Sequence, residues 1–189
     1  MYGRTKPVTR YFISDHHFGH ASTWEKFKRA DGSPLRVFSS TEEMDEHMIE
    51  RWNAVVRPED SVYHLGDFVI NRKHMHIGHR LNGRKRLVRG NHDVFKTREY
   101  LDIGFEEIYG VWVEPKDRII CSHIPLHPDS VKEGWLNIHG HLHYGRVQMK
   151  DQFTKHTTGA GKIDQRYVNV AVEMTNYTPL TLEQVRGIC

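Results

Sequence analysis

The sequence is poor in several features that mark whole classes of protein. Only two of its 189 residues are cysteines, Cys121 and Cys189, so we expect no disulfide framework and a reducing, cytoplasmic compartment. No apolar run approaches the roughly 18 residues that a membrane-spanning helix needs. The basic N-terminus has no apolar signal-peptide segment behind it. We therefore expect a cytoplasmic protein without a membrane partner.

An excess of charge of one sign is also missing. Lys and Arg number 27 and Asp and Glu 24, and the resulting net charge of +3 is too small to indicate wholesale nucleic-acid binding. One local cluster of cations precedes the Gly90 block: Arg80, Arg84, Lys85, Arg86 and Arg89. This cluster either places positive charge near a phosphate-bearing ligand or keeps a solvated strand edge from aggregating. The length fits one domain, so we expect residues 1–189 to form a single domain.

Residue types that bind metal ions recur in five short blocks. They are Asp15-His16-His17, Gly66-Asp67, Gly90-Asn91-His92-Asp93, His123, and Gly140-His141-Leu142-His143. Each block ends an apolar, β-branched run, where a strand would stop and a loop would project side chains into a shared crevice. Carboxylate, carboxamide and imidazole without a thiolate pair form an oxygen and nitrogen ligand set suited to manganese, iron, zinc or nickel. The blocks together predict a hydrolytic metal centre.

The pattern along the chain predicts alternating strands and helices. Strands are expected over residues 10–14, 61–65, 86–89, 111–113, 119–122, 136–139 and 167–174, and helices over residues 22–28, about 40–56, 74–81 and 182–185. The expected capping residues are Ser22 with Glu25, and Ser39 or Ser40 with a glutamate three residues later. Residues 144–166 are expected to form a loop or an irregular hairpin. This alternation indicates a parallel-rich α/β fold, in which ligands bind beyond the carboxyl ends of the strands.

The five blocks, in this order, resemble the motifs of the calcineurin-like metallophosphoesterase superfamily. The match runs from about Asp15 to His143, and all five blocks are intact. As a set they are specific, whereas a single Asp or Asn after a strand is more often a turn or capping residue. The resemblance implies an α/β fold of four layers, an α/β/β/α sandwich with two mixed β-sheets and a dinuclear metal site at the strand ends.

The resemblance also implies which residues hold the ions. One ion would take Asp15, His17, Asp67 and His143, and the second would take Asp67, Asn91, His123 and His141. Asp67 would then be the carboxylate that bridges two divalent ions. Manganese is the favoured ion, with iron, zinc or nickel as alternatives.

The implied activity is that of a phosphoesterase that hydrolyses phosphodiester or phosphomonoester bonds. A metal-bridging hydroxide would attack phosphorus, because two ions that share a water lower its pKa. His92 would stabilise or protonate the leaving oxygen, and Asp93 would orient the imidazole of His92. His20 and Arg89 are further candidates for contact with a phosphate-ester substrate, which could be a nucleotide or an oligonucleotide.

Two other functions stay open at this point. The first is a small nuclease or a cyclic-nucleotide phosphodiesterase, encouraged only by the basic residues 84–89. The second is a non-catalytic scaffold of the same fold, although every ligand position is filled here. A zincin protease is excluded because the His-Glu-x-x-His motif is absent. The sequence leaves the oligomeric state open.

Overall fold

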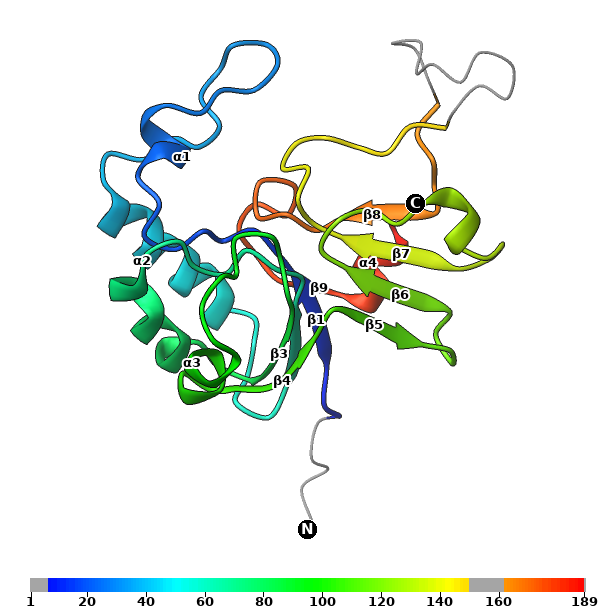
Figure 1. Ribbon diagram of the computed structural model, residues 1–189, viewed down its shortest axis with the longest axis horizontal. Helices are drawn as coiled ribbons and strands as arrows, with labels where there is room; N and C mark the ends of the chain where they lie inside the picture. Colours follow the sequence, from blue (N-terminus) through cyan, green and yellow to red (C-terminus); the bar gives the residue numbers. More distant parts are fainter. Residues whose placement is uncertain (1–6, 150–161, 189) are drawn as a thin grey trace.

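The computed structural model describes residues 7–149 and 162–188, whose strands form two mixed sheets (Figure 1). The first sheet has the strand order β4 (Phe105–Tyr109), β3 (Arg84–Val88), β2 (Ser61–His64), β1 (Arg10–Ile13) and β9 (Leu180–Thr181). Its first four strands are parallel, and β9 is antiparallel to β1. The second sheet has the order β5 (Val111–Glu114), β6 (Ile119–Ser122), β7 (Leu136–His139) and β8 (Tyr167–Asn169), with only β5 antiparallel. The α/β class and the two mixed sheets agree with the prediction.

Helices connect these strands. They are α1 (Ser22–Glu25), α2 (Thr41–Asn53), the 3-10 helix η1 (Arg72–Arg80), α3 (Thr97–Asp102), the 3-10 turn η2 (Pro128–Ser130) and α4 (Leu182–Arg186). Figure 1 shows α1, α2 and α3 on one side of the first sheet and the second sheet on its other side. In the described part of the chain, no helix has the length and apolar character needed to cross a membrane.

Helix α2 forms where its caps and apolar stripe predict. The Ser40 side chain accepts a hydrogen bond from the Glu43 backbone N–H at 3.0 Å, and the Glu43 side chain accepts one from the Ser39 N–H at 2.7 Å. Met44, Met48 and Trp52 follow at helical spacing and are fully buried against the first sheet. The capping box predicted at Ser22 is wrong, because Ala21 precedes α1 and offers no side-chain cap.

Two apolar cores separate the layers. The first lies between the helices and the first sheet, and includes Met48, Trp52 and Phe105. The second lies between the two sheets, where Phe12 and Val88 pack with Cys121 and with Val185 of α4. Helices, first sheet and second sheet thus make three layers. A fourth, helical layer stays a prediction.

The structure also differs from the predicted elements in places. The sequence did not predict α3 and β4, whose short apolar stretches are broken by charged residues. The strand predicted over residues 167–174 ends at Asn169, because the next residues leave β8 and bond to Ser14, from Ser14 N–H to Val170 O at 3.0 Å and from Val172 N–H to Ser14 O at 3.1 Å. The predicted hairpin has an antiparallel bridge from Gln148 to Ile163, and its residues 150–161 lie outside the described residues.

Candidate metal centre

The strand registers bring the five blocks to one edge of the molecule. Ile13 of β1 is paired with His64 of β2, and His64 with Leu87 of β3, so the loops that follow these strands start at the same level. In the second sheet, Cys121 of β6 pairs with Ile138 of β7. A parallel bridge between Ser14 and Ala171 joins the two sheets at this edge. Residues from both sheets therefore meet in one place.

Two groups of side chains here could hold metal ions. Group one is Asp15, His17 and His143, group two is Asp67, His123 and His141, and within each group the potential ligand atoms lie within 4.8 Å of one another. The Oδ2 atom of Asp67 lies 3.3 Å from the His123 Nε2 and 3.5 Å from the His17 Nε2. One carboxylate oxygen thus lies between the two groups, the position that a bridging ligand needs.

Asn91 completes group two. Its Oδ1 lies 2.9 Å from the His123 Nε2 and 3.0 Å from the His141 Nδ1, and these two nitrogens are 3.3 Å apart. Donor atoms about 2.1 Å from one ion and at right angles lie about 3 Å apart. The separations therefore match those of ligands around a shared ion.

Hydrogen bonding shows that group two directs lone pairs at one another. The His123 Nδ1 lies 2.8 Å from the Leu65 carbonyl oxygen, which can only accept, so Nδ1 carries the proton there. In the neutral ring the Nε2 lone pair then points at two more acceptors, the oxygens of Asp67 and Asn91. Either a second proton on His123 or a cation satisfies this arrangement. The residues present therefore fit a divalent ion with oxygen and nitrogen ligands.

Five of the potential ligands have left-handed backbone conformations. The φ angles are 61° at Asp15, 50° at His17, 56° at Asp67, 68° at His141 and 48° at His143. Such angles are uncommon for residues other than glycine and cost of order 1 kcal/mol or more each. Five of the eight such residues other than glycine in the described part of the chain belong to the two groups, so backbone strain is concentrated at this site.

Two glycines allow the loops to approach closely. A Cβ atom on Gly90 would lie 2.2 Å from the Asp67 Oδ1, and one on Gly140 would lie 2.2 Å from the Asp15 Oδ2. No other residue fits at either position without moving a carboxylate. The glycines before Asn91 and His141 thus permit a close approach of the loops that a side chain would block.

Electrostatics differ between the two carboxylates. Burial raises the pKa of Asp15 to about 6, against the lowering effect of His123 and His143. Burial also acts to raise the pKa of Asp67, but the hydrogen bond and charge of His123 outweigh it, and the pKa falls below its ordinary value. Burial lowers the pKa of His17 well below its ordinary value. A neutral His17 is the form that can bind a metal ion.

Asp93 supports the loops rather than the His92 imidazole. Its Oδ2 accepts hydrogen bonds from the backbone N–H groups of Asp67 and Gly90, both at 2.8 Å. Its Oδ1 accepts hydrogen bonds from the Phe68 N–H at 3.0 Å and from the Tyr100 hydroxyl at 3.3 Å. These bonds occupy both oxygens, so the structure gives no support to the predicted role of Asp93 in orienting His92. The backbone N–H of His92 instead donates to the Asp67 Oδ1 at 2.8 Å.

The remaining predicted residues surround the groups. The exposed ring of His92 has its centroid 5.4 Å from that of His17, and the His20 ring lies 5.7 Å from His17 on another side. Arg89 donates to the Phe95 carbonyl at 2.7 Å and lines a cavity of about 340 Å³ together with Asn91 and His123. His20 and Arg89 are thus both close enough to contact a ligand held at the groups.

The sequence reasoning missed a buried ion pair behind group one. Arg36 and Glu173 have no exposed side-chain surface, and the Arg36 Nε donates to the Glu173 Oε1 at 2.8 Å. The guanidinium also donates to the backbone oxygens of His16 at 2.7 Å and Asp15 at 2.6 Å. The Glu173 Oε1 lies 3.0 Å from the His143 Nδ1. The pair therefore contacts both segments of group one, the Asp15 loop and His143, although its two residues are 137 positions apart.

Glu173 has the same sequence pattern that singles out Asp15 as a candidate site residue. It is an acidic residue at the end of the apolar run Val170–Val172, but we read that stretch as a continuing strand. Burial acts to raise the pKa of Glu173, and the charges of Arg36 and His143 outweigh it and hold this pKa at about 2. Arg36 gave no signal in the sequence, since it stands in a loop without a motif.

Most residues of the basic cluster have partners outside the two metal-binding groups. Arg80 pairs with Glu46 at 2.6 Å, and Arg84 pairs with Glu106 at 3.0 Å. Arg86 pairs with Glu107 at 3.2 Å, and the buried Lys85 donates to the Leu81 carbonyl at 2.8 Å. These contacts favour the solvated strand edge over a phosphate-binding patch. Of the basic residues that encouraged the nuclease alternative, Arg89 is the one that lines a cavity together with residues of group two.

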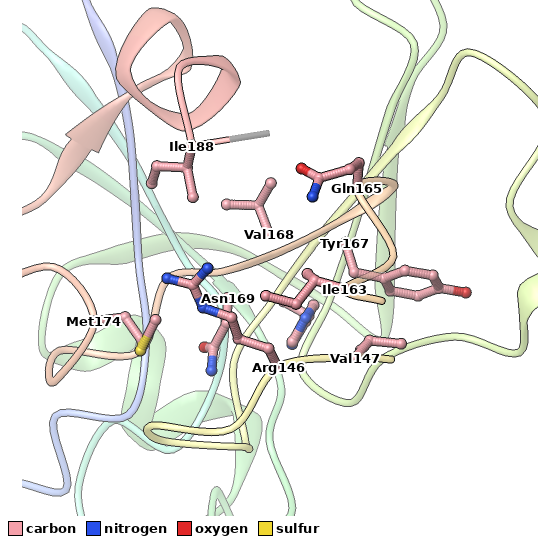
Figure 2. Close-up of a pocket in the computed structure, with 10 residues that line it drawn as sticks. Arg146, Val147, Ile163, Gln165, Tyr167, Val168, Asn169, Met174 and Ile188 are labelled. Atoms are coloured by element: carbon pink, nitrogen blue, oxygen red, sulfur yellow. The ribbon is translucent and has the colours of Figure 1, made fainter. Parts of the chain in front are cut away.

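Cavities near the groups differ in size. Figure 2 shows a pocket beside β8 that is lined by Arg146, Ile163, Tyr167 and Met174, among others, and its volume of about 30 Å³ has room for about one water molecule. A larger cavity of about 520 Å³ is lined by His143 of group one. Only the larger cavities can hold a substituent of a substrate.

Comparison with known proteins finds one relative in sequence and several solved structures that match most of this chain. No family model matches this chain. The uncharacterized protein MJ1445 of Methanocaldococcus jannaschii is 32% identical over 187 residues, covering 93% of this chain and 88% of that protein. The crystal structure of a protein of unknown function, AQ665 from Aquifex aeolicus, matches with a TM-score of 0.61 and 27% identity, covering 97% of this chain and 100% of that one. A novel archaeal phosphodiesterase matches with a TM-score of 0.46 and 20% identity, covering 87% of this chain and 82% of that one.

Proposed function

This chain belongs to the same family as MJ1445 of Methanocaldococcus jannaschii, and we propose that it is a metal-dependent phosphoesterase. The observation that carries the proposal is the Asp67 Oδ2, placed 3.5 Å from the His17 Nε2 of group one and 3.3 Å from the His123 Nε2 of group two. A hydrolase that uses two ions needs a single ionised carboxylate in this position. Residues 1–189 would act as one domain, since both sheets contribute to the two groups.

In this proposal Asp15, His17, Asp67 and His143 hold one ion, and Asp67, Asn91, His123 and His141 hold the other. Two divalent ions, with manganese as the first candidate, would acidify water and neutralise charge on the phosphate oxygens. The protein supplies the geometry: Asp93 fixes the backbone of Asp67, and the Arg36–Glu173 pair fixes that of Asp15.

His92 has the second chemical role in the proposal. Its exposed ring stands beside His17, and its backbone is held by the Asp67 carboxylate. A ring nitrogen of His92 would donate a proton to the leaving oxygen of the ester, the usual task of a general acid. His20 and Arg89 would contact the phosphate or its substituents.

The test is hydrolysis of a chromogenic phosphate bis-ester and mono-ester with added manganese, by the wild type and Asp67→Asn. We expect turnover of at least one ester by the wild type, and none above the chelator-treated level in the variant, together with the loss of both ions in elemental analysis. Asp129→Asn is the matched control, because that side chain is 92% exposed and lies beside His127, which belongs to neither group. Wild-type protein that binds two ions yet hydrolyses neither ester would instead support the scaffold.

A further inference from the structure

A cavity of about 520 Å³ adjoins group one. It is lined by residues of two loops, Phe27–Ala30 with Leu35 and Leu142–Gly145, and the second loop includes His143 of group one. This volume falls within the range of small-molecule sites in proteins. A phosphate held at the two groups would therefore have one substituent at the mouth of this cavity.

Aromatic side chains form much of the cavity wall. The Phe27 side chain lines the cavity and is 46% exposed, so its ring is accessible to a ligand there. Its ring lies edge-on to the His20 ring at 5.4 Å between centroids, and His20 is in turn 5.7 Å from His17. A chain of rings thus leads from group one to the exposed Phe27.

Tyr144 is fixed on the other loop. The Arg29 guanidinium lies over the Tyr144 ring, 3.6 Å from its centroid, and also donates a hydrogen bond to the Tyr144 hydroxyl. Cation and ring hold each other in place, so the tyrosine is ordered before a ligand arrives. Lys28 and Arg29 add positive charge to the same cavity.

We propose that this cavity binds a planar aromatic ring carried by the phosphate ester. A partly exposed phenylalanine ring with neighbouring cations favours a flat, polarisable ring over an alkyl chain, because a ring gains from stacking as well as from burial. A nucleobase and an aryl alcohol share this chemistry. The inference rests on the proposed function for the position of the phosphate, and it names the class of substrate.

The test compares three phosphate monoesters that differ only in the group attached: adenosine 5′-monophosphate, phenyl phosphate and ribose 5-phosphate. Their affinities for the manganese-loaded protein are measured by titration calorimetry, under conditions in which phosphate release during the titration stays negligible. We expect at least one of the two aromatic esters to bind about 10-fold more tightly than ribose 5-phosphate, as stacking on one aromatic side chain allows. The ester with the higher affinity identifies the source of the ring.

Variants of Phe27 then assign the effect to this cavity. Phe27→Ala should abolish the aromatic preference and leave the affinity for ribose 5-phosphate unchanged, while Phe27→Tyr should keep the preference. Val37→Ala is the control, since Val37 is an apolar residue of the neighbouring loop, 80% exposed, and does not line the cavity. Equal affinity of the wild type for all three esters, or an equal loss for all three in Phe27→Ala, would overturn the inference. An aromatic preference without hydrolysis of any ester would count against the proposed function alone.

Discussion

The two ends of the first sheet are built on opposite principles. At the carboxyl ends of β1 and β2, Asp15 and Asp67 are buried with left-handed backbones, and burial raises the pKa of Asp15 to about 6. At the amino end of β2, the buried Asp60 accepts the backbone N–H groups of Thr9 and Arg57, each at 2.9 Å, and pairs with the Arg57 side chain at 2.7 Å. The hydrogen bonds and charge of Arg57 lower the pKa of Asp60 to about 2.

In this sheet, backbone strain and unfavourable burial of charge lie at the carboxyl ends of the strands. The sheet holds Asp60, whose charged form the fold stabilises, at one end, and Asp15, whose charged form burial disfavours, at the other. Strain of this kind persists only where surrounding structure fixes it. Here the fixing contacts are the Arg36–Glu173 pair behind group one and the four hydrogen bonds of Asp93 behind group two. The carboxyl end thus gathers the candidate metal ligands at a cost in stability, whereas the amino end carries a stabilising ion pair.

The largest effect should come from the exposed histidine at the carboxyl end. His92→Ala should lower kcat by about 10²- to 10⁴-fold, the range for loss of a general acid, while both ions stay bound. Steady-state kinetics and elemental analysis on the same preparation check this. His127→Ala, in an exposed turn with a side chain that is 68% exposed, is the control. Loss of an ion from His92→Ala would show that His92 is a ligand.

A smaller effect should follow from weakening the support behind group one. Glu173→Gln removes the charge that faces Arg36 and the His143 Nδ1, and carboxylates of this kind typically contribute 10- to 100-fold to metal affinity. We expect one of the two manganese ions to bind that much more weakly and the other to keep its affinity. Manganese titration followed by electron paramagnetic resonance separates the two.

The exposed Glu133→Gln is the matched control for that titration. Equal weakening of both ions would contradict the separation of the supports, because Asp93 and not Glu173 contacts the loops of group two. Unchanged affinity for both ions would show that the buried pair serves folding alone.

The sequence predicted the residues that gather in the two groups better than the residues that support them. The order of strands and the glycines before Asn91 and His141 could be read from local patterns, because alternation, strand ends and turn residues act over a few positions. The contact of Arg36 with Glu173 could not, since these two residues are 137 positions apart. The predicted role of Asp93 depended on its position next to His92 in the sequence. Its hydrogen-bond partners instead depend on how the loop of Asp67 folds over it.

The comparison of the two ends finally predicts stability changes of opposite sign in the metal-free protein. Asp15→Asn should raise the free energy of unfolding at pH 7 by about 1 to 3 kcal/mol, because the raised pKa makes the buried charge unfavourable above pH 6, and the gain should shrink as the pH falls towards 4. Asparagine also tolerates the left-handed angle.

Asp60→Asn should lower the free energy of unfolding by about 2 kcal/mol at pH 7. Because the pKa of Asp60 is lowered to about 2, that loss should persist down to pH 4 and fade only as the pH approaches 2. Urea unfolding in the presence of a chelator at several pH values measures both, and a destabilisation of the same size in both variants would refute the distinction between the two ends.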